Sequence, residues 1–187
     1  QQTLTAYLLP YALMTLWHGA LSDALGRRRV ILVSVALFAL ASAGCMFATR
    51  IEHLWLMRAL QGITAGAGMV VARAIVRDLY DGAPAQRLIA HITMVFALAP
   101  AIAPVLGGWL QSWFGWRSVF AFLVLLGFAL WLACWYLLPE TLPRDQRHSL
   151  HARYLARAYW KVLTSSAFLL TCGALALNFA AFFIYVL

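Results

Sequence analysis

The segment Gly19-Ala20-Leu21-Ser22-Asp23-Ala24-Leu25-Gly26-Arg27-Arg28-Arg29 decides the fold of this chain. It places one acid, two glycines and three arginines between two apolar segments, residues 4–21 and 30–48. Charged side chains are costly in lipid, so charge at this position needs a structural or functional reason. Gly19 and Gly26 permit a tight turn with close backbone approach. Asp23 could pair with an arginine or cap the positive end of a neighbouring helix. The segment therefore predicts a charged hinge between two membrane-spanning helices, the alternative being a set of arginines that only orients the helices.

The rest of the chain has the composition of an integral membrane protein. Hydrophobic residues make up 64% of the 187 residues and charged residues only 11%, whereas soluble domains carry about a quarter charged residues. No Asp, Glu, Lys or Arg falls in residues 1–22, 30–49, 88–116, 118–139 or 162–187. Each of these stretches can cross a bilayer, which takes roughly 20 apolar residues. We predict an all-α membrane bundle, because a helix satisfies its own backbone in lipid.

Six spans are predicted, at residues 4–21, 30–48, 54–75, 88–110, 119–138 and 167–187. Ten basic residues lie in or beside the first, third and fifth connections, whereas Arg50 and Arg117 lie in the second and fourth. By the positive-inside rule the basic connections are cytoplasmic, so the first span runs from outside to inside. This orientation explains the net charge of +8 better than nucleic-acid binding does, and we predict no nucleic-acid partner.

The spans and their connections suggest three regions. Residues 1–138 hold five spans, residues 139–166 form a connector, and residues 167–187 form the last span. Apolar residues recur at helical spacing within 150–163, and Arg153, Arg157 and Lys161 share another face. This pattern predicts an amphipathic helix on the cytoplasmic membrane surface. A flexible polar linker is the alternative.

Other chemistry is not indicated by the sequence. The cysteines, Cys45, Cys134 and Cys172, all lie in apolar runs and form neither a disulfide framework nor a metal site. We find no cofactor motif, no paired catalytic carboxylates and no nucleophile motif, so we expect no enzyme. The chain begins inside one apolar segment without an initiator methionine and stops at the end of another. We therefore expect it to be part of a longer protein.

The third span carries a charge inside its apolar run. Arg58 lies about 6 Å inside the outer boundary, at a rise of about 1.5 Å per residue, and Gln61 follows on the same face. A buried arginine needs an acid, a carbonyl or water; snorkelling to the headgroups is the alternative. Gly62 and Gly66 form a small-xxx-small pair, which predicts close approach of a neighbouring helix. Arg73 and Arg77 share a face at the inner end, next to Asp78 in sequence.

Two further patterns concern the first, fourth and last spans. Polar and aromatic residues form a stripe along the first span, and the last span holds one polar residue; they are Tyr7, Tyr11, Thr15, His18 and Asn178. They could line a substrate cavity or form interhelical hydrogen bonds. The fourth span contains helix-bending and small residues, Pro100, Pro104, Gly107 and Gly108, which predict a bent helix with a smooth packing face.

Four of these patterns resemble motifs of the major facilitator superfamily. The turn formed by Gly19, Asp23, Gly26, Arg27 and Arg28 is similar to its signature loop after the second helix. The run 54–62 matches its fourth-helix motif Leu-x-x-x-Arg-x-x-Gln-Gly, and Arg-x-x-x-Arg-Asp-Leu-Tyr at 73–80 resembles the bicyclomycin/chloramphenicol-resistance branch of its drug:proton antiporters. Residues 103–108 resemble the antiporter motif Gly-Pro-x-x-Gly-Gly, with Ala103 in place of the first glycine.

The resemblance implies a fold and a function. The chain would cover the second to seventh helices of the superfamily bundle, five from one half and one from the other, with the remaining helices absent. The parent would be an inner-membrane exporter of chloramphenicol- or bicyclomycin-like drugs that takes up protons in exchange by alternating access. The turn would stabilise one conformation, and Arg58, Gln61, Arg73, Arg77 and Asp78 would serve proton coupling or the cavity. The alternatives are a transporter of sugars or other metabolites, and a non-transporting membrane subunit.

Overall fold

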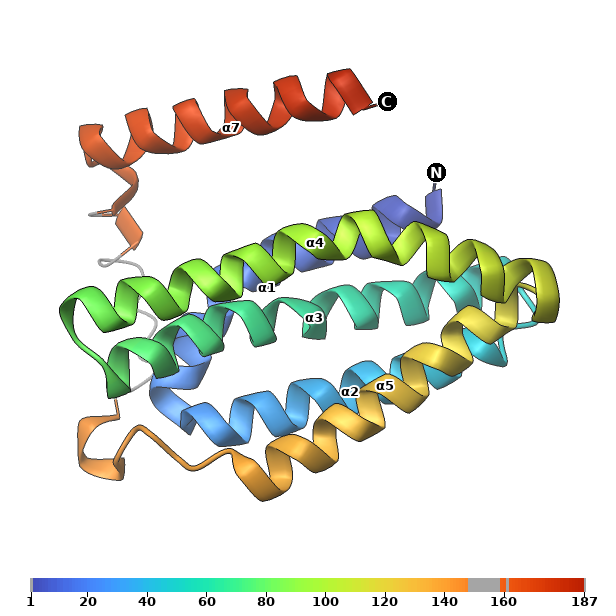
Figure 1. The fold of residues 1–187 in the computed structure, drawn as a ribbon, viewed down its shortest axis with the longest axis horizontal. Helices are drawn as coiled ribbons and strands as arrows, with labels where there is room; N and C mark the ends of the chain where they lie inside the picture. The colour runs from blue at the N-terminus through green and yellow to red at the C-terminus, as the bar shows by residue number, and fades with distance from the viewer. Residues whose placement is uncertain (1, 148–158, 161, 187) are drawn as a thin grey trace. The chain divides into compact units, whose positions relative to one another are not determined.

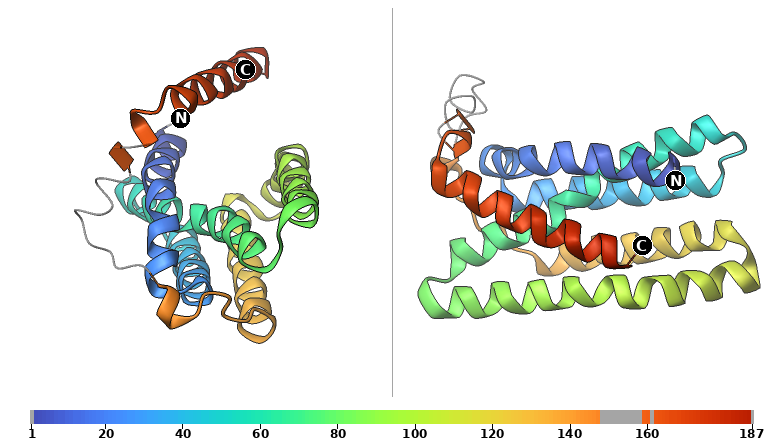
Figure 2. Two further views of the ribbon diagram at one scale, coloured as in Figure 1. Left: turned by 90° about the vertical axis from the view of Figure 1, so that its left-hand side faces the viewer. Right: turned by 90° about the horizontal axis from the view of Figure 1, so that it is seen from above.

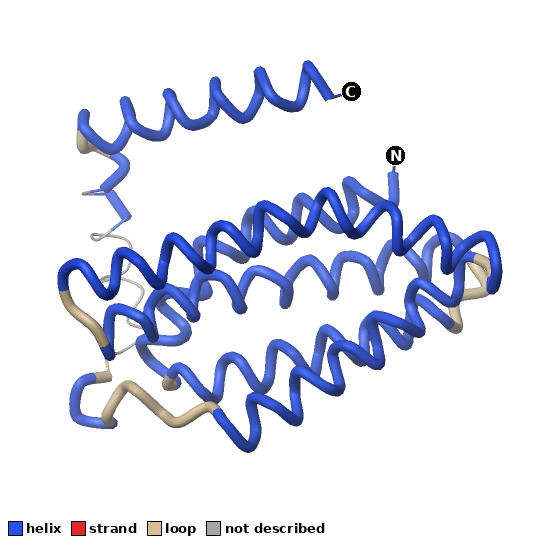
Figure 3. Tube along the Cα trace, in the orientation of Figure 1, coloured by secondary structure: helices blue, strands red, loops and turns tan. Residues whose placement is uncertain are grey.

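A computed structural model describes residues 2–147, 159–160 and 162–186, with backbone only at 178–179 and 181–186. Helices occur at every predicted span, and the described residues contain no strand (Figure 3), so the predicted all-α class is confirmed. The elements are α1 (Gln2–Leu25), α2 (Arg27–Met46), α3 (Ile51–Leu79), α4 (Gly82–Phe114), α5 (Trp116–Leu137), η1 (Arg144–Gln146) and α7 (Ser166–Val186).

The chain divides into two compact units, Gln1–His148 and Ser149–Leu187. The first unit holds α1 to α5 and η1, and the second holds α7. The amphipathic helix expected within residues 150–163 falls mostly outside the described residues, together with Arg153, Arg157 and Lys161. It stays a prediction.

Four of the described helices, α2 to α5, are long and apolar enough to cross a membrane. α1 is also 24 residues long, but Tyr7, Pro10, Tyr11 and His18 lower the hydropathy of its apolar run. In α7 the apolar segment that the description covers is Ser166–Leu177. The helices extend past the predicted spans; α4, for example, begins at Gly82 rather than at residue 88. Helical hydrogen bonding continues through the polar interface, where hydropathy no longer marks it.

Within the first unit, α3 is the central helix. It packs against α1 on one side and α2 on the other, while α5 packs against α2 and α4 packs against α5 (Figures 1 and 2). A small core of Val30, Ile31, Ala67 and Val71 joins α2 to α3. α1 and α2 diverge from their common turn and contact each other much less than either contacts α3. This divergence leaves space between them.

The predicted close approach at the two glycines of α3 is confirmed. A Cβ added at Gly62 would collide with the backbone carbonyl of Tyr7 in α1. A Cβ added at Gly66 would lie 2.6 Å from Oγ1 of Thr15 and 3.3 Å from Nδ1 of His18. The absent side chains allow α1 to lie directly on α3, as small-residue interfaces do in membranes.

Gly62→Ala is expected to destabilise the full-length protein by about 1–3 kcal/mol, the usual cost of overpacking a close contact. The clash is with backbone, so no side-chain rotation relieves it and α1 must move away from α3. Thermal unfolding in detergent measures the effect. The matched control is Gly68→Ala on the same helix, where an added Cβ meets nothing within 4 Å. Equal unfolding temperatures for the two variants would contradict this account of the α1–α3 contact.

The small residues predicted to form a packing face on the fourth span are not covered by other described residues of the first unit. α4 continues as a helix through Pro100 and Pro104. A Cβ at Gly107 or Gly108 would meet no atom within 4 Å, and Ile102 is 53% exposed. The predicted bend and packing face of α4 therefore stay predictions.

Candidate functional site

Three connections meet at one end of the first unit, on the left in Figure 1. They are the turn after α1, the end of α3 and the segment after α5, and hydrogen bonds join all three. The charge distribution placed these connections on one side of the membrane, and this grouping is confirmed. That this side is cytoplasmic stays a prediction from the positive-inside rule.

Arg27 is the centre of this end. Its Nε donates to Oδ2 of Asp78 at 3.0 Å, and its Nη1 donates to Oγ of Ser22 at 2.6 Å and pairs with Asp23. The Arg27 side chain is 8% exposed, that of Asp78 18% and that of Asp23 41%. One nearly buried guanidinium thus holds two carboxylates from two helices, a charge-assisted arrangement that is strong when it is shielded from water.

The N-terminus of α2 is capped by Glu140, a residue remote from it in sequence. Oε1 of Glu140 accepts from the backbone N–H of Arg27 at 2.9 Å and from that of Leu142 at 3.2 Å. Its Oε2 lies 3.4 Å from Nη2 of Arg147. A carboxylate here satisfies an otherwise unpaired N–H and complements the positive end of the helix dipole.

The backbone at Gly26 allows this approach. Its φ is +98°, a backbone angle that residues with a side chain rarely adopt. A Cβ at this position would also collide with the side chains of Glu140 and Arg147. Sequence reasoning considered Asp23 for the helix cap, but the structure gives Asp23 the pairing with Arg27 and gives the cap to Glu140. Nothing local in the Pro139-Glu140-Thr141 run, which follows the end of α5, links it to a turn 113 residues away.

Two more contacts tie the end of α5 to the end of α3 and to the turn. Oγ1 of Thr141 donates to Oδ2 of Asp78 at 3.0 Å, and Nη2 of Arg28 donates to the Trp135 carbonyl at 2.5 Å. The Arg28 guanidinium also lies 5.6 Å from the centre of the Trp135 ring. We call the joined set the inner latch; its members are Ser22, Asp23, Gly26, Arg27, Arg28, Asp78, Trp135, Glu140, Thr141 and Arg147.

Glu140→Ala is expected to lower the stability of the full-length protein by about 1–2 kcal/mol, the range for loss of a helix N-cap. The variant leaves the Arg27 N–H without its acceptor and Arg147 without its ion pair. Thermal unfolding in detergent compares it with Asp145→Ala, which removes an exposed acid of η1. If both variants unfold at the same temperature as the wild type, the Glu140 cap contributes nothing to the stability of the protein.

A second polar group surrounds Arg58, near the other end of α3. Nη1 of Arg58 donates to Oε1 of Gln61 at 2.9 Å, and Nε2 of Gln61 donates to Oγ of Ser42 at 2.7 Å. The Cys45 thiol lies 3.6 Å from the same Gln61 oxygen, and the Arg58 guanidinium lies 4.6 Å from the centre of the Tyr7 ring. We call these five residues the Arg58 cluster. Gln61, Ser42 and Cys45 are fully buried.

The Arg58 cluster holds a cation with neutral partners. Among the described residues the ion pairs involve Arg27 and Arg147, and none involves Arg58. An amide oxygen and an aromatic face stabilise the charge without cancelling it. The guanidinium is directed at Gln61 and Tyr7, which disfavours simple snorkelling. The expected acidic partner from an absent helix stays a prediction.

The structure separates the residues grouped for proton coupling. Arg58 and Gln61 lie in the Arg58 cluster, whereas Asp78 belongs to the inner latch about 30 Å away along α3. Arg73 is partly buried, with no hydrogen bond to its Nε within the described residues, and Arg77 is exposed. The structure does not bring these arginines to Arg58.

The polar stripe of α1 runs along α3. The rings of Tyr7 and Tyr11 stack at 6.0 Å, Oγ1 of Thr15 donates to the Tyr11 carbonyl at 2.7 Å, and His18 is 2% exposed. The contacts of the stripe with α3 include those of the Tyr7 ring with Arg58 and of Thr15 and His18 with Gly66. Its contact with substrate stays a prediction. The side chain of Asn178 lies outside the described residues.

The sequence matches the family described as Major Facilitator Superfamily over residues 1–187. It is 36% identical over 147 residues to Multidrug resistance protein D of Escherichia coli (strain K12), covering 78% of this chain and 37% of that protein. It is 39% identical over 142 residues to the Chloramphenicol resistance protein of Pseudomonas aeruginosa, covering 75% of this chain and 34% of that protein. The chain thus spans little more than a third of these relatives, and the resemblance to the drug-resistance branch is confirmed.

A solved structure supports the fold independently. The human organic anion transporter MFSD10 (TETRAN) superposes with a TM-score of 0.70 at 28% sequence identity, covering 83% of this chain and 36% of that one. The described helices therefore form part of a known transporter bundle.

Proposed function

This chain belongs to the major facilitator superfamily, and we propose that its full-length protein exports amphipathic drugs of the chloramphenicol or bicyclomycin kind in exchange for protons. The observation that carries the proposal is the similarity of this chain to two drug-resistance proteins. The protein is a multi-pass membrane transporter; we place it in the inner membrane, with the latch at the cytoplasmic face. Its partners there would be drugs, protons and lipids.

The inner latch supports alternating access because its bonds cross between elements. Arg27 joins α1 and α2 to Asp78 of α3, and Glu140 and Thr141 join both to the segment after α5. When α3 moves relative to the turn, the bond between Arg27 and Asp78 breaks. A ligand can drive such a change only by binding one conformation better than the other.

The Arg58 cluster supports proton coupling because its cation lacks an acidic partner among the described residues. A carboxylate that approaches such a cation is favoured in its charged form, and one that moves away regains its proton more readily. Movement of a helix bearing an acid past Arg58 would therefore link proton release to the conformational change. The drug would contact aromatic and apolar cavity faces.

Inverted membrane vesicles that contain the full-length protein test the proposal. With a proton gradient imposed, adding chloramphenicol is expected to release protons in proportion to drug uptake, and vesicles without the protein give the background. Sugars and organic anions are the comparison substrates. Proton release with either of them and none with drugs would reject drug export in favour of the metabolite alternative.

A further inference from the structure

The three arginines of the turn have different surroundings. Arg27 is held by Asp23 and Asp78, and Arg28 by the Trp135 carbonyl and ring. Within the described residues Arg29 has no ion pair, and its side chain is exposed. The inner latch therefore accounts for two of the three charges and leaves the third without a function.

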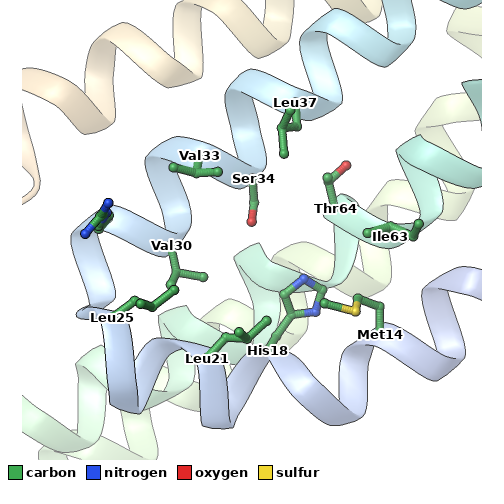
Figure 4. A pocket seen from close by; sticks show the side chains of 11 residues that line it. Met14, His18, Leu21, Leu25, Val30, Val33, Ser34, Leu37, Ile63 and Thr64 are labelled. Carbon is green, nitrogen blue, oxygen red and sulfur yellow. The ribbon is translucent and has the colours of Figure 1, made fainter. Parts of the chain in front are cut away.

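Arg29 is one of the residues that line a groove between the diverging helices α1 and α2. Figure 4 shows the side chains of the groove. The groove has a volume of about 330 Å³, and α3 forms its floor through Ile63 and Thr64. Its other lining residues are mostly apolar: Met14, His18, Leu21 and Leu25 from α1, and Val30, Val33, Ser34 and Leu37 from α2. Val33 is 52% exposed and Leu37 is 48% exposed, so the groove is open at the surface of the first unit.

The length of the groove fits one leaflet. Its α1 wall runs from Leu25 to Met14, about 16 Å at the helical rise of about 1.5 Å per residue. The hydrocarbon core is about 30 Å thick, so one leaflet is about 15 Å deep. A chain entering beside Arg29 would therefore follow the groove through most of the leaflet on that side.

A nearly buried imidazole lines the groove. His18 is 2% exposed, and its Nδ1 has no hydrogen bond within the described residues. Figure 4 shows the His18 ring directed into the space between the α1 and α2 walls. Nδ1 itself faces α3, 3.3 Å from the position of a Cβ on Gly66, so the groove is lined at this point by the apolar part of the ring.

We propose that this groove binds one acyl chain of an anionic phospholipid from the cytoplasmic leaflet, with the headgroup phosphate on Arg29. Charge complementarity selects this occupant, because an unpaired cation stands at headgroup depth beside an apolar channel of leaflet length. The bound chain fills the space between α1 and α2 next to the inner latch. Such a lipid would stiffen the turn on which the latch is built.

The test uses the full-length protein, freed of lipid in detergent and titrated with phosphatidylglycerol, with native mass spectrometry to count the bound lipid. Arg29→Gln is expected to weaken binding of the first lipid about fivefold, the equivalent of about 1 kcal/mol per basic residue near the surface. Val33→Trp, which fills the groove from an exposed position, is expected to abolish it. Arg87→Gln, an exposed arginine at the same end, is the matched control and should bind as the wild type does.

Two comparisons identify the part of the lipid that is recognised. Phosphatidylcholine with the same chains should bind less tightly than phosphatidylglycerol, and inorganic phosphate should not displace the lipid. Displacement by phosphate would mean an anion site without a chain, which overturns the proposal. Equal lipid binding by wild type, Arg29→Gln and Val33→Trp would overturn it too. Thermal unfolding of each variant verifies folding, and Leu37→Trp replaces Val33→Trp if that variant does not fold.

Discussion

Arg58→Ala is expected to abolish proton-driven drug efflux by the full-length protein, by about a hundredfold or more, while leaving it folded. The substitution removes the cation over the Tyr7 ring and the donor to Gln61. Gln61 keeps its bond to Ser42, so the buried amide stays anchored. A coupling free energy of about 3 kcal/mol between proton and drug transport corresponds to a change of about a hundredfold in efflux. Drug-dependent proton release from inverted vesicles is the measurement.

Two further variants separate charge from geometry at this position. Arg58→Lys keeps the charge but loses the planar guanidinium that lies against Tyr7, so partial activity is expected. Arg50→Ala removes an exposed arginine at the start of the same helix and should export drug normally. Intact proton-driven efflux by a folded Arg58→Ala protein would reject proton coupling at the Arg58 cluster. That result would not contradict the fold or the contacts of the inner latch.

Arg27→Gln is expected to destabilise the latched conformation by about 2–4 kcal/mol and to reduce transport about tenfold or more. Removing one partner of a nearly buried pair costs about 3–5 kcal/mol, because the remaining charge is uncompensated. Here Asp78 is 18% exposed and Asp23 is 41% exposed, so water offsets part of that cost. Thermal unfolding and cysteine accessibility of the turn measure stability and conformation.

A double variant isolates the reason for the loss. Arg27→Gln with Asp78→Asn removes the uncompensated carboxylate, so stability should recover in part while transport remains low. Arg87→Gln, which lies outside the latch, is the control for loss of one positive charge at this end. If Arg27→Gln alone transports as the wild type does, the latch is not a conformational switch.

The fold was predictable because lipid imposes simple rules on a sequence. Charge-free stretches of about twenty residues marked the helices, since only a helix satisfies its backbone there. The alternation of basic connections grouped the loops that meet at the inner latch. The spacing of Gly62 and Gly66 predicted the contact with α1, because a missing side chain acts locally. Each of these signals is read from neighbours in sequence.

The partners of the charged residues were less predictable. Asp23 could have paired with an arginine or capped a helix, and the structure shows that it pairs with Arg27. The cap of α2 is Glu140, which is 113 residues from Arg27 in sequence. The resemblance grouped Asp78 with Arg58 for proton coupling or the cavity. In the structure the two lie at opposite ends of α3, and Asp78 binds Arg27 instead. The link between Gln61 and Ser42 also crosses from one helix to another.

The sequence by itself determined that this chain is a helical membrane bundle with a charged turn and a buried arginine. Hydropathy, charge and glycine spacing are properties of short segments, and the bilayer converts them directly into helices, ends and contacts. Only the tertiary structure decided that Arg27 holds two carboxylates, Asp23 and Asp78, what caps α2, and that Arg29 lines an open groove while its two neighbours are engaged. These outcomes depend on how far α1 and α2 diverge and on where α5 ends, and both are set by packing between segments remote in sequence.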